Sequence, residues 1–253
     1  MSRLLAALVL LALAMPARAE TLIASLSTSR VAITSNYTGA SIVVFGAIER
    51  DAQTIARAGP YDIVVTVRGP RHDLVVREKD ALGPIWINRD EQRFPNAPLF
   101  IAVLSSRPLA EVTTESTRRR LRVGLDAIVQ AADFTTDRGE GDDPFRTALA
   151  RIMAASSLYI ENPRGATFLT PSLFRAAVPL PAVAPPGNYE VDVLLFADNV
   201  LLARAQTHFE LVKIGFEQQM AALAREWAWL YGLGVALMAL GFGWIASVIF
   251  RRD

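Results

Sequence analysis

The chain has 253 residues, of which 26 are lysine or arginine and 25 are aspartate or glutamate, so its formal charge is only +1. This balance excludes the strongly basic surface that nucleic-acid binding requires. Because the sequence contains no cysteine, disulfides, thiolate metal sites and acylation of a cysteine are also excluded.

The first 19 residues have the three-part pattern of a cleaved secretory signal. Arg3 precedes an apolar run, and Ala17 and Ala19 place small residues at the two positions that determine cleavage. The apolar run is too short to span a bilayer as a stable helix. We therefore predict a signal peptide over residues 1–19, followed by an exported chain.

Residues 21 to 105 have the pattern of short strands separated by turn residues. Ser41–Ile48 is nearly continuously apolar, which is typical of a central strand buried on both faces. Gly69–His72 predicts a hairpin-like break between two strands. Short strands without intervening helices favour a β-sandwich. The other predicted strands are Thr21–Leu26, Arg30–Thr34, Asp62–Arg68, Asp73–Arg77, Pro84–Asn88 and Leu99–Leu104.

The spacing of apolar residues then changes to that of helices. Apolar residues recur at i, i+4 and i+7 between Glu115 and Gln130, which predicts one helix there. A second helix follows Asp143, which can cap it, and has Pro144 in its first turn. The polar segment 133–143 between them is predicted to be a loop. We therefore predict a helical insertion at about 115–158.

The strand pattern returns after residue 165. Phe174–Leu180 is one predicted strand, and alternating Tyr189–Ala197 and Val200–Val212 predict a hairpin. Gly187–Val191 resembles the start of the closing strand pair of immunoglobulin-like sandwiches. We predict a mainly β fold over 20–213, an immunoglobulin-like sandwich with the helical segment inserted. Two smaller β domains separated by the helices are the alternative.

The C-terminal stretch 227–250 contains no charged residue. As a helix it would be roughly 36 Å long, enough to cross a hydrocarbon core of about 30 Å. Apolar residues at helical spacing over 214–226 predict an amphipathic juxtamembrane helix that continues into this stretch, for about 35 residues in total. We therefore predict a transmembrane helix over 227–250 and a cytoplasmic tail at 251–253.

Aromatic and basic residues flank this stretch. Trp227, Trp229 and Tyr231 at one end and Arg251 and Arg252 at the other are predicted interface anchors, with the N-terminal domain periplasmic and the C-terminus cytoplasmic. Small residues at three- and four-residue spacing are candidates for packing against another helix, although such residues are also common in membrane helices generally. These candidates are Gly232, Ala236, Ala239, Gly243 and Ser247.

No catalytic constellation is evident. The only histidines, His72 and His208, are predicted to lie in a turn and on the outward face of a strand, and no hydrolase or metalloprotease motif is present. The acidic loop 133–143 lacks the spacing of a calcium loop, and Arg118–Arg120 fits an exposed helix face as well as an anion site. We predict that the protein is not an enzyme and has no cofactor or metal site.

Several segments have distinctive sequences that cover nearly the whole exported chain. They are Ser35–Gly39, Val44–Glu49, Val65–Pro70, Ile85–Asn88, Ser105–Leu109, Gly187–Val191, Lys213–Gln218 and Leu230–Leu233. Together they resemble a family of alphaproteobacterial transmembrane proteins of unknown function. The resemblance implies a protein of the inner membrane of a Gram-negative bacterium, with its exported domain in the periplasm. It also implies a loose association with transporters of the sulfite-exporter type.

These observations lead us to expect a non-enzymatic binding or accessory module at the lipid bilayer. Its expected partner is an integral membrane protein such as a transporter, or a second copy that associates through the anchor helix. The alternative functions are a periplasmic receptor for a small ligand or a metal, which would use the acidic loop or the arginine-rich helix, and an envelope enzyme.

Overall fold

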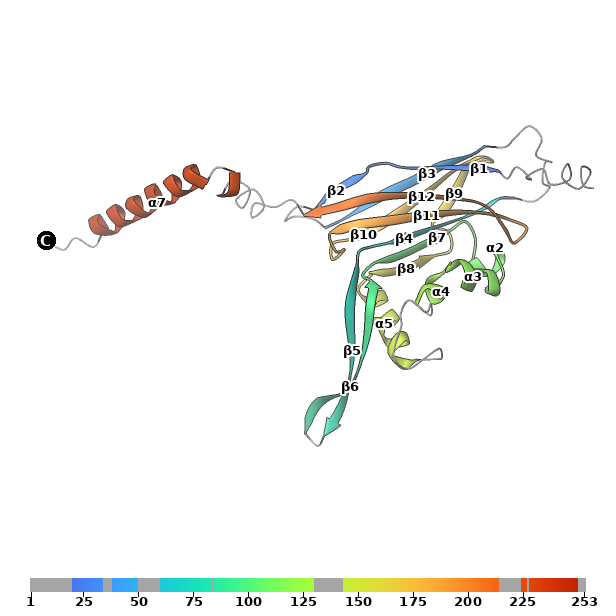
Figure 1. The fold of residues 1–253 in the computed structure, drawn as a ribbon, viewed down its shortest axis with the longest axis horizontal. Helices are drawn as coiled ribbons and strands as arrows, with labels where there is room; N and C mark the ends of the chain where they lie inside the picture. Colours follow the sequence, from blue (N-terminus) through green and yellow to red (C-terminus); the bar gives the residue numbers. More distant parts are fainter. Residues whose placement is uncertain are drawn as a thin grey trace, which may run out of the picture. The chain divides into compact units, whose positions relative to one another are not determined.

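The computed structural model describes residues 20–33, 38–49, 60–82, 84–129, 143–213, 224–226 and 228–249. The chain divides into two compact units. The first comprises Met1–Val31 and Thr38–Leu211, and the second comprises Ala32–Tyr37 and Val212–Asp253. The first unit is mainly β (Figure 1).

The larger sheet has six strands in the order β2-β12-β11-β4-β7-β8. Asp198 and Asn199 join β11 to β12 and both have positive φ, as a two-residue hairpin turn of the primed type requires. This hairpin is confirmed as predicted. The strands are β2 (Arg30–Ile33), β12 (Val200–Lys213), β11 (Gly187–Ala197), β4 (Asp62–Arg68), β7 (Ile101–Ser105) and β8 (Tyr159–Asn162).

The smaller sheet has four antiparallel strands in the order β1-β3-β10-β9. Strands β9 and β10 both contact β4 and β7, so this sheet covers one face of the larger sheet. Val44, Phe174 and Val178 are among the fully buried side chains that the smaller sheet contributes. The strands are β1 (Thr21–Leu26), β3 (Gly39–Glu49), β10 (Leu173–Pro181) and β9 (Ala166–Thr170).

Between β7 and β8, the described residues form four short helices, which cover the other face of the larger sheet. Leu109, Ile128 and Phe145 from these helices form one apolar cluster with Val64 and Phe196 of the sheet. Because both faces are covered, a central strand such as β4 is buried along nearly its whole length. The helices are α2 (Leu109–Val112), α3 (Glu115–Leu121), α4 (Leu125–Val129) and α5 (Pro144–Ala155).

The predicted helices are only partly correct. Helix α5 begins as predicted, because the Asp143 side chain accepts a hydrogen bond from the Phe145 N–H at 3.0 Å. The single helix predicted over 115–130 is wrong. Arg122 ends α3 in the left-handed conformation with φ +54°, and Gly124 follows with φ +97°, so the chain turns before α4.

Strands β5 (Arg71–Leu82) and β6 (Ile85–Pro98) form a separate two-stranded sheet, which we call the arm. Figure 1 shows the arm projecting away from the two larger sheets. The predicted pairing across Gly69–His72 is wrong, because β4 pairs with β11 and β7, whereas β5 pairs only with β6 among the described strands. The parallel pair β7–β8 and the arm also depart from the two antiparallel sheets of an immunoglobulin-like sandwich.

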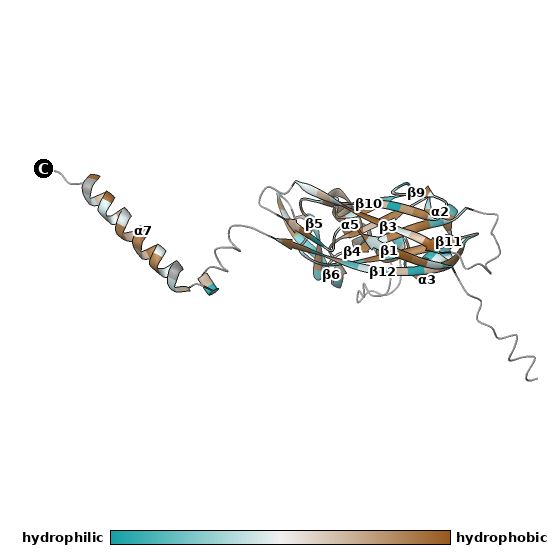
Figure 2. Ribbon diagram, turned by 90° about the horizontal axis from the view of Figure 1, so that it is seen from above, coloured by the Kyte–Doolittle hydropathy of each residue, from teal (hydrophilic) through white to brown (hydrophobic). Residues whose placement is uncertain are grey.

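The predicted fold class is also corrected at the C-terminus. Within the described part of the chain, no helix combines the length and the apolar character needed to cross a membrane. Helix α7 (Ala228–Ile249) has 22 residues, most of them apolar in Figure 2, and is shorter than the expected helix of about 35 residues. Residues 224–226 are also helical, whereas 214–223 and 227 lie outside the described residues, so the predicted continuity of this helix from residue 214 stays a prediction.

Some predictions fall outside the described residues. These are the signal peptide at 1–19, most of the juxtamembrane segment 214–226, and the tail 251–253. Residues 133–142 of the acidic loop lie outside them as well.

Candidate functional site

The arm is a long, regular β-hairpin. Its register runs from Arg71 opposite Pro98 to Leu82 opposite Ile85, with two irregularities along β5. At the first of these, the Asp73 carboxylate accepts a hydrogen bond of 2.9 Å from the backbone N–H of Asn96. A β5 of 12 residues is roughly 40 Å long at about 3.3 Å per residue. The arm therefore carries its tip well beyond its base.

The base of the arm is part of the hydrophobic core. Val76, Phe94 and Ala97 are buried and belong to the same apolar cluster as the helices that cover the larger sheet. In addition, the Tyr159 hydroxyl of β8 donates a hydrogen bond of 2.8 Å to the carbonyl of Pro98, the last residue of β6. These contacts fix the direction in which the arm leaves the unit.

The tip of the arm is apolar and exposed. The exposed fraction of Ile85 is 57% and that of Trp86 is 72%, and Ile87 is also exposed. Large apolar side chains are rarely left adjacent and uncovered on a water-facing surface, and such groups mark binding sites more often than isolated exposed residues do. The tip, defined as residues 85–87, is therefore the candidate contact surface.

Paired charges flank the tip. Arg77 and Glu91 lie opposite each other on the two strands with a 3.1 Å Nε–Oε2 contact, and Arg89 pairs with Asp80 at 2.5 Å. Residues 71–98 contain five basic and five acidic residues in all. The basic and acidic residues of the arm therefore balance, and its largest exposed apolar side chains lie at the tip.

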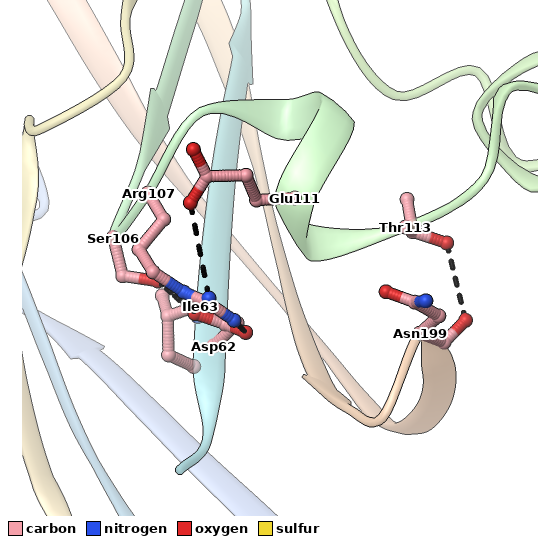
Figure 3. A network of polar contacts seen from close by, with 7 residues as sticks. All are labelled: Asp62, Ile63, Ser106, Arg107, Glu111, Thr113 and Asn199. Carbon is pink, nitrogen blue, oxygen red and sulfur yellow. Dashed lines mark hydrogen bonds and ion pairs between the residues drawn. The ribbon is translucent and has the colours of Figure 1, made fainter.

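The carboxylate of Asp62, at the start of β4, is buried and belongs to a structural network. It accepts hydrogen bonds from the Ser106 hydroxyl at 2.9 Å and from the Arg107 guanidinium, whose Nε lies 2.8 Å away (Figure 3). Ser106 also accepts from the Ile63 N–H at 3.2 Å. These hydrogen bonds join Asp62, at the start of β4, to the residues that follow β7. Because both of its carboxylate oxygens accept hydrogen bonds within the protein, Asp62 has a structural role. The hydrogen bonds raise the pKa of Arg107 despite some desolvation.

The two histidines lie on different strands. His72 is exposed on β5 near the base of the arm, and His208 is exposed on β12. His208 lines an open polar hollow of about 950 Å³ on the surface of the larger sheet, together with Arg30 and Glu210, which are themselves ion-paired at 2.9 Å.

The five candidate packing residues of α7 are all exposed. Apart from the adjoining residues and the nearby backbone of α7 itself, no described atom lies within 4 Å of the position that a Cβ would occupy at Gly232 or Gly243. Ala236, Ala239 and Ser247 are exposed as well. A helix-packing role for this face therefore stays a prediction.

The predicted interface anchors are described only in part. Trp229 is 68% exposed and Tyr231 is 42% exposed. Trp227, Arg251 and Arg252 lie outside the described residues. Sequence reasoning assigned residues 84–88 to a strand but did not assign them a contact role, although three adjacent large apolar residues after Gly83-Pro84 were a usable signal.

Comparisons with known proteins agree with the resemblance seen in the sequence. A search of curated proteins finds no match. A family model, described as "Putative transmembrane protein (Alph_Pro_TM)", matches residues 21–252, which is nearly the whole chain after the predicted signal peptide. The chain belongs to this alphaproteobacterial family.

Proposed function

We propose that the protein is a non-enzymatic, membrane-associated binding module whose arm docks with its tip on an integral membrane protein. The observation that supports this function is the adjacent pair Ile85 and Trp86 at the end of the arm, exposed by 57% and 72%. Burying such side chains in a partner's pocket is favourable by about 1.5–3 kcal/mol for each large apolar side chain. Tryptophan is also over-represented among the residues that dominate binding energy.

The charge of the arm favours a protein pocket over a lipid surface as the occupant. Peripheral hairpins and helices that bind anionic lipids combine apolar residues with a surplus of lysine and arginine. Here the arm has as many acidic as basic residues, and Arg89 beside the tip is paired with Asp80. An apolar tip on a neutral stem suits a hydrophobic pocket with a polar rim.

The anchoring of the arm supports a docking role. Phe94, with no exposed surface, and Tyr159 hold its base against the core, so the tip is presented before any partner arrives. Preorganisation of this kind reduces the conformational entropy lost on binding. A protruding pair of strands with an anchored base is thus better suited to docking than an exposed loop without strand pairing.

The family assignment supports a location at a membrane. The signal pattern at 1–19 supports export, and we propose that the β-rich unit works on the periplasmic side of the inner membrane. A transporter is the kind of partner that the family resemblance suggests.

In-cell photo-crosslinking tests this function. A photoreactive phenylalanine derivative is placed at Ile85 in the full-length protein, and for comparison at Leu169 on β9, which is also 57% exposed. We expect a covalent adduct with one integral membrane protein from position 85 and none from position 169. The same adduct should disappear when Trp86→Ala is added, and remain when Val183→Ala is added at an exposed site off the arm.

Mass spectrometry of the adduct separates the competing occupants. A peptide of another integral membrane protein, present with intact Trp86 and absent with Trp86→Ala, supports the proposal. Crosslinks to phospholipid, crosslinks only to a second copy of this chain, or equal yields at positions 85 and 169 would each overturn it.

A further inference from the structure

Arginines from several separate elements line one small pocket in the first unit. It has a volume of about 380 Å³, and its wall contains five arginines and a single acidic residue, Glu190. Arg68 ends β4, Arg71 begins the arm, and Arg204 comes from β12. Arg120 and Arg122 come from the C-terminal end of α3. The pocket lies where α3, the base of the arm and the larger sheet meet.

One buried carboxylate compensates part of this positive charge. Asp192 on β11 accepts two hydrogen bonds from the Arg204 guanidinium, the one from Nε at 2.7 Å, and lies 3.6 Å from Nη1 of Arg68. Bidentate pairing of this kind is the strongest arginine–carboxylate geometry, and it raises the pKa of Arg204. Asp192 and Glu190 together still leave an excess of arginine charge around the pocket.

Of the two arginines that pair with Asp192, Arg68 is less exposed than Arg204. Its side chain is only 16% exposed, and its Nη2 donates a hydrogen bond of 3.3 Å to the Arg122 carbonyl at the end of α3. Burial lowers the pKa of Arg68 from its ordinary value, the Asp192 carboxylate opposes that effect, and the nearby charge of Arg71 lowers the pKa further. A further anion beside Arg68 would relieve this repulsion.

Arg71 and Arg120 supply the charge that the pocket can offer to a ligand. Both are exposed, and among the described residues neither forms an ion pair with a carboxylate. They come from the arm and from α3, so they approach the pocket from two of its sides. If the arginines served only to pair with Asp192 inside the protein, Arg71 and Arg120 would not be needed at this pocket.

We propose that this pocket binds a small, multiply charged oxyanion, with sulfate and phosphate as the simplest members of the class. The planar guanidinium fork donates two parallel hydrogen bonds to such an ion, and several forks around one cavity match a tetrahedral oxyanion. A volume near 380 Å³ is within the range of small-ligand sites and far too small for a folded partner. This inference does not depend on docking of the tip.

Calorimetric titration of the full-length protein in mild detergent tests the site. Sodium sulfate and sodium phosphate are titrated separately, and sodium chloride at equal ionic strength is the reference. We expect saturable binding of at least one dianion with a stoichiometry near one, and no saturable binding of chloride. If neither dianion binds saturably, the proposal is overturned.

Two neighbouring arginines on α3 provide a matched pair of variants. Arg120 lines the pocket, whereas Arg119 does not and is paired with Glu115 at 2.5 Å. Arg120→Gln and Arg71→Gln should each raise the dissociation constant of the dianion about tenfold or more, as expected for loss of a charged hydrogen bond. Arg119→Gln should leave it within about twofold. Equal weakening by Arg119→Gln and Arg120→Gln would show a diffuse charge effect and overturn the assignment of the site.

Discussion

Strand β4 and the arm follow each other in the chain, yet they use β-structure in opposite ways. Six of the seven residues of β4 are buried, since the smaller sheet covers one face and the helices cover the other. The arm has an ordinary ladder but touches the core only near its base, through residues such as Val76 and Phe94. Burial thus stabilises the first region, whereas the second uses the same backbone geometry to present a contact surface.

The change between the two regions occurs at Gly69 and Pro70. A Cβ at Gly69 would lie 2.8 Å from Cβ of Phe100 and 3.1 Å from the Tyr189 ring, so a side chain at this position would force the packing apart. Pro70 follows and cannot donate a ladder hydrogen bond. The chain therefore leaves the larger sheet here and begins a separate pair of strands.

The largest expected effect lies in the doubly covered sheet. Phe196 on β11 has no exposed surface and belongs to the cluster between the sheet and the helices. Phe196→Ala should lower the free energy of unfolding by about 3–5 kcal/mol, because it removes apolar contacts and leaves a cavity. Urea denaturation followed by circular dichroism measures this loss. A change below about 1 kcal/mol would contradict the difference drawn between the two regions.

A smaller loss is expected where the sheet meets the arginine pocket. Asp192→Asn keeps the shape of the side chain but removes the charge that pairs with Arg204 and with the buried Arg68. We expect a loss of about 2–3 kcal/mol in unfolding free energy, because hydrogen bonds to a charged group are lost and desolvated guanidinium charge is left uncompensated. Ser172→Ala, in the turn between β9 and β10, is the control and should change stability by less than about 0.5 kcal/mol.

The contact between β8 of the larger sheet and the base of the arm should respond to pH. Tyr159→Phe removes the hydrogen bond to the Pro98 carbonyl and should cost about 1 kcal/mol near pH 7. Burial raises the pKa of Tyr159 well above its ordinary value, so the folded state holds the proton more tightly than the unfolded state does. The corresponding stability is present below about pH 10 and is lost as the pH rises further.

Urea denaturation at two pH values tests whether Tyr159 lowers the folding stability as the pH rises. Between pH 8 and pH 11, the wild-type protein should lose more stability than Tyr159→Phe, which has no phenol to ionise. An equal loss in both proteins would show that this hydroxyl does not titrate differently on folding.

The smallest effect on stability is expected at the tip of the arm. Trp86→Ala should change the free energy of unfolding by less than about 0.5 kcal/mol, because 72% of this side chain is already exposed. The same substitution should abolish the crosslink from position 85, so stability and binding separate at this residue. A loss of 2 kcal/mol or more in the urea titration would mean that the tip is part of the folded core.

Strands with a strong local signal could be predicted from the sequence. Thr21–Leu26 and Asp62–Arg68 have the predicted bounds, and the strand predicted over Tyr189–Ala197 ends where predicted but begins two residues earlier, at Gly187. In these segments an apolar or alternating run ends at clear turn residues. Most of the length of the arm was not predicted. Its strands β5 and β6 carry many charged residues, and several of these form ion pairs only with residues of the opposite strand. The length of the arm depends on the pairing of β5 with β6, which the sequence of either strand alone does not reveal.

The candidate sites depend still more on tertiary structure. Arg118–Arg120 was noticed as a run, but only Arg120 of these three lines the pocket, together with arginines from β4, the arm and β12. Because these arginines are far apart in the sequence, the sequence alone does not show that they line one pocket. Likewise, the break at Arg122 follows from a left-handed residue that helix propensity does not predict, because arginine is a good helix former.

Arg71 is both the first residue of the arm and part of the wall of the arginine pocket. An ion held there is therefore coupled to the element that carries the tip. If the ion changes the affinity of docking by some factor, docking must change the affinity for the ion by the same factor. Arg71, at the base of the arm, would then couple binding of the oxyanion in the pocket to binding of the partner at the tip.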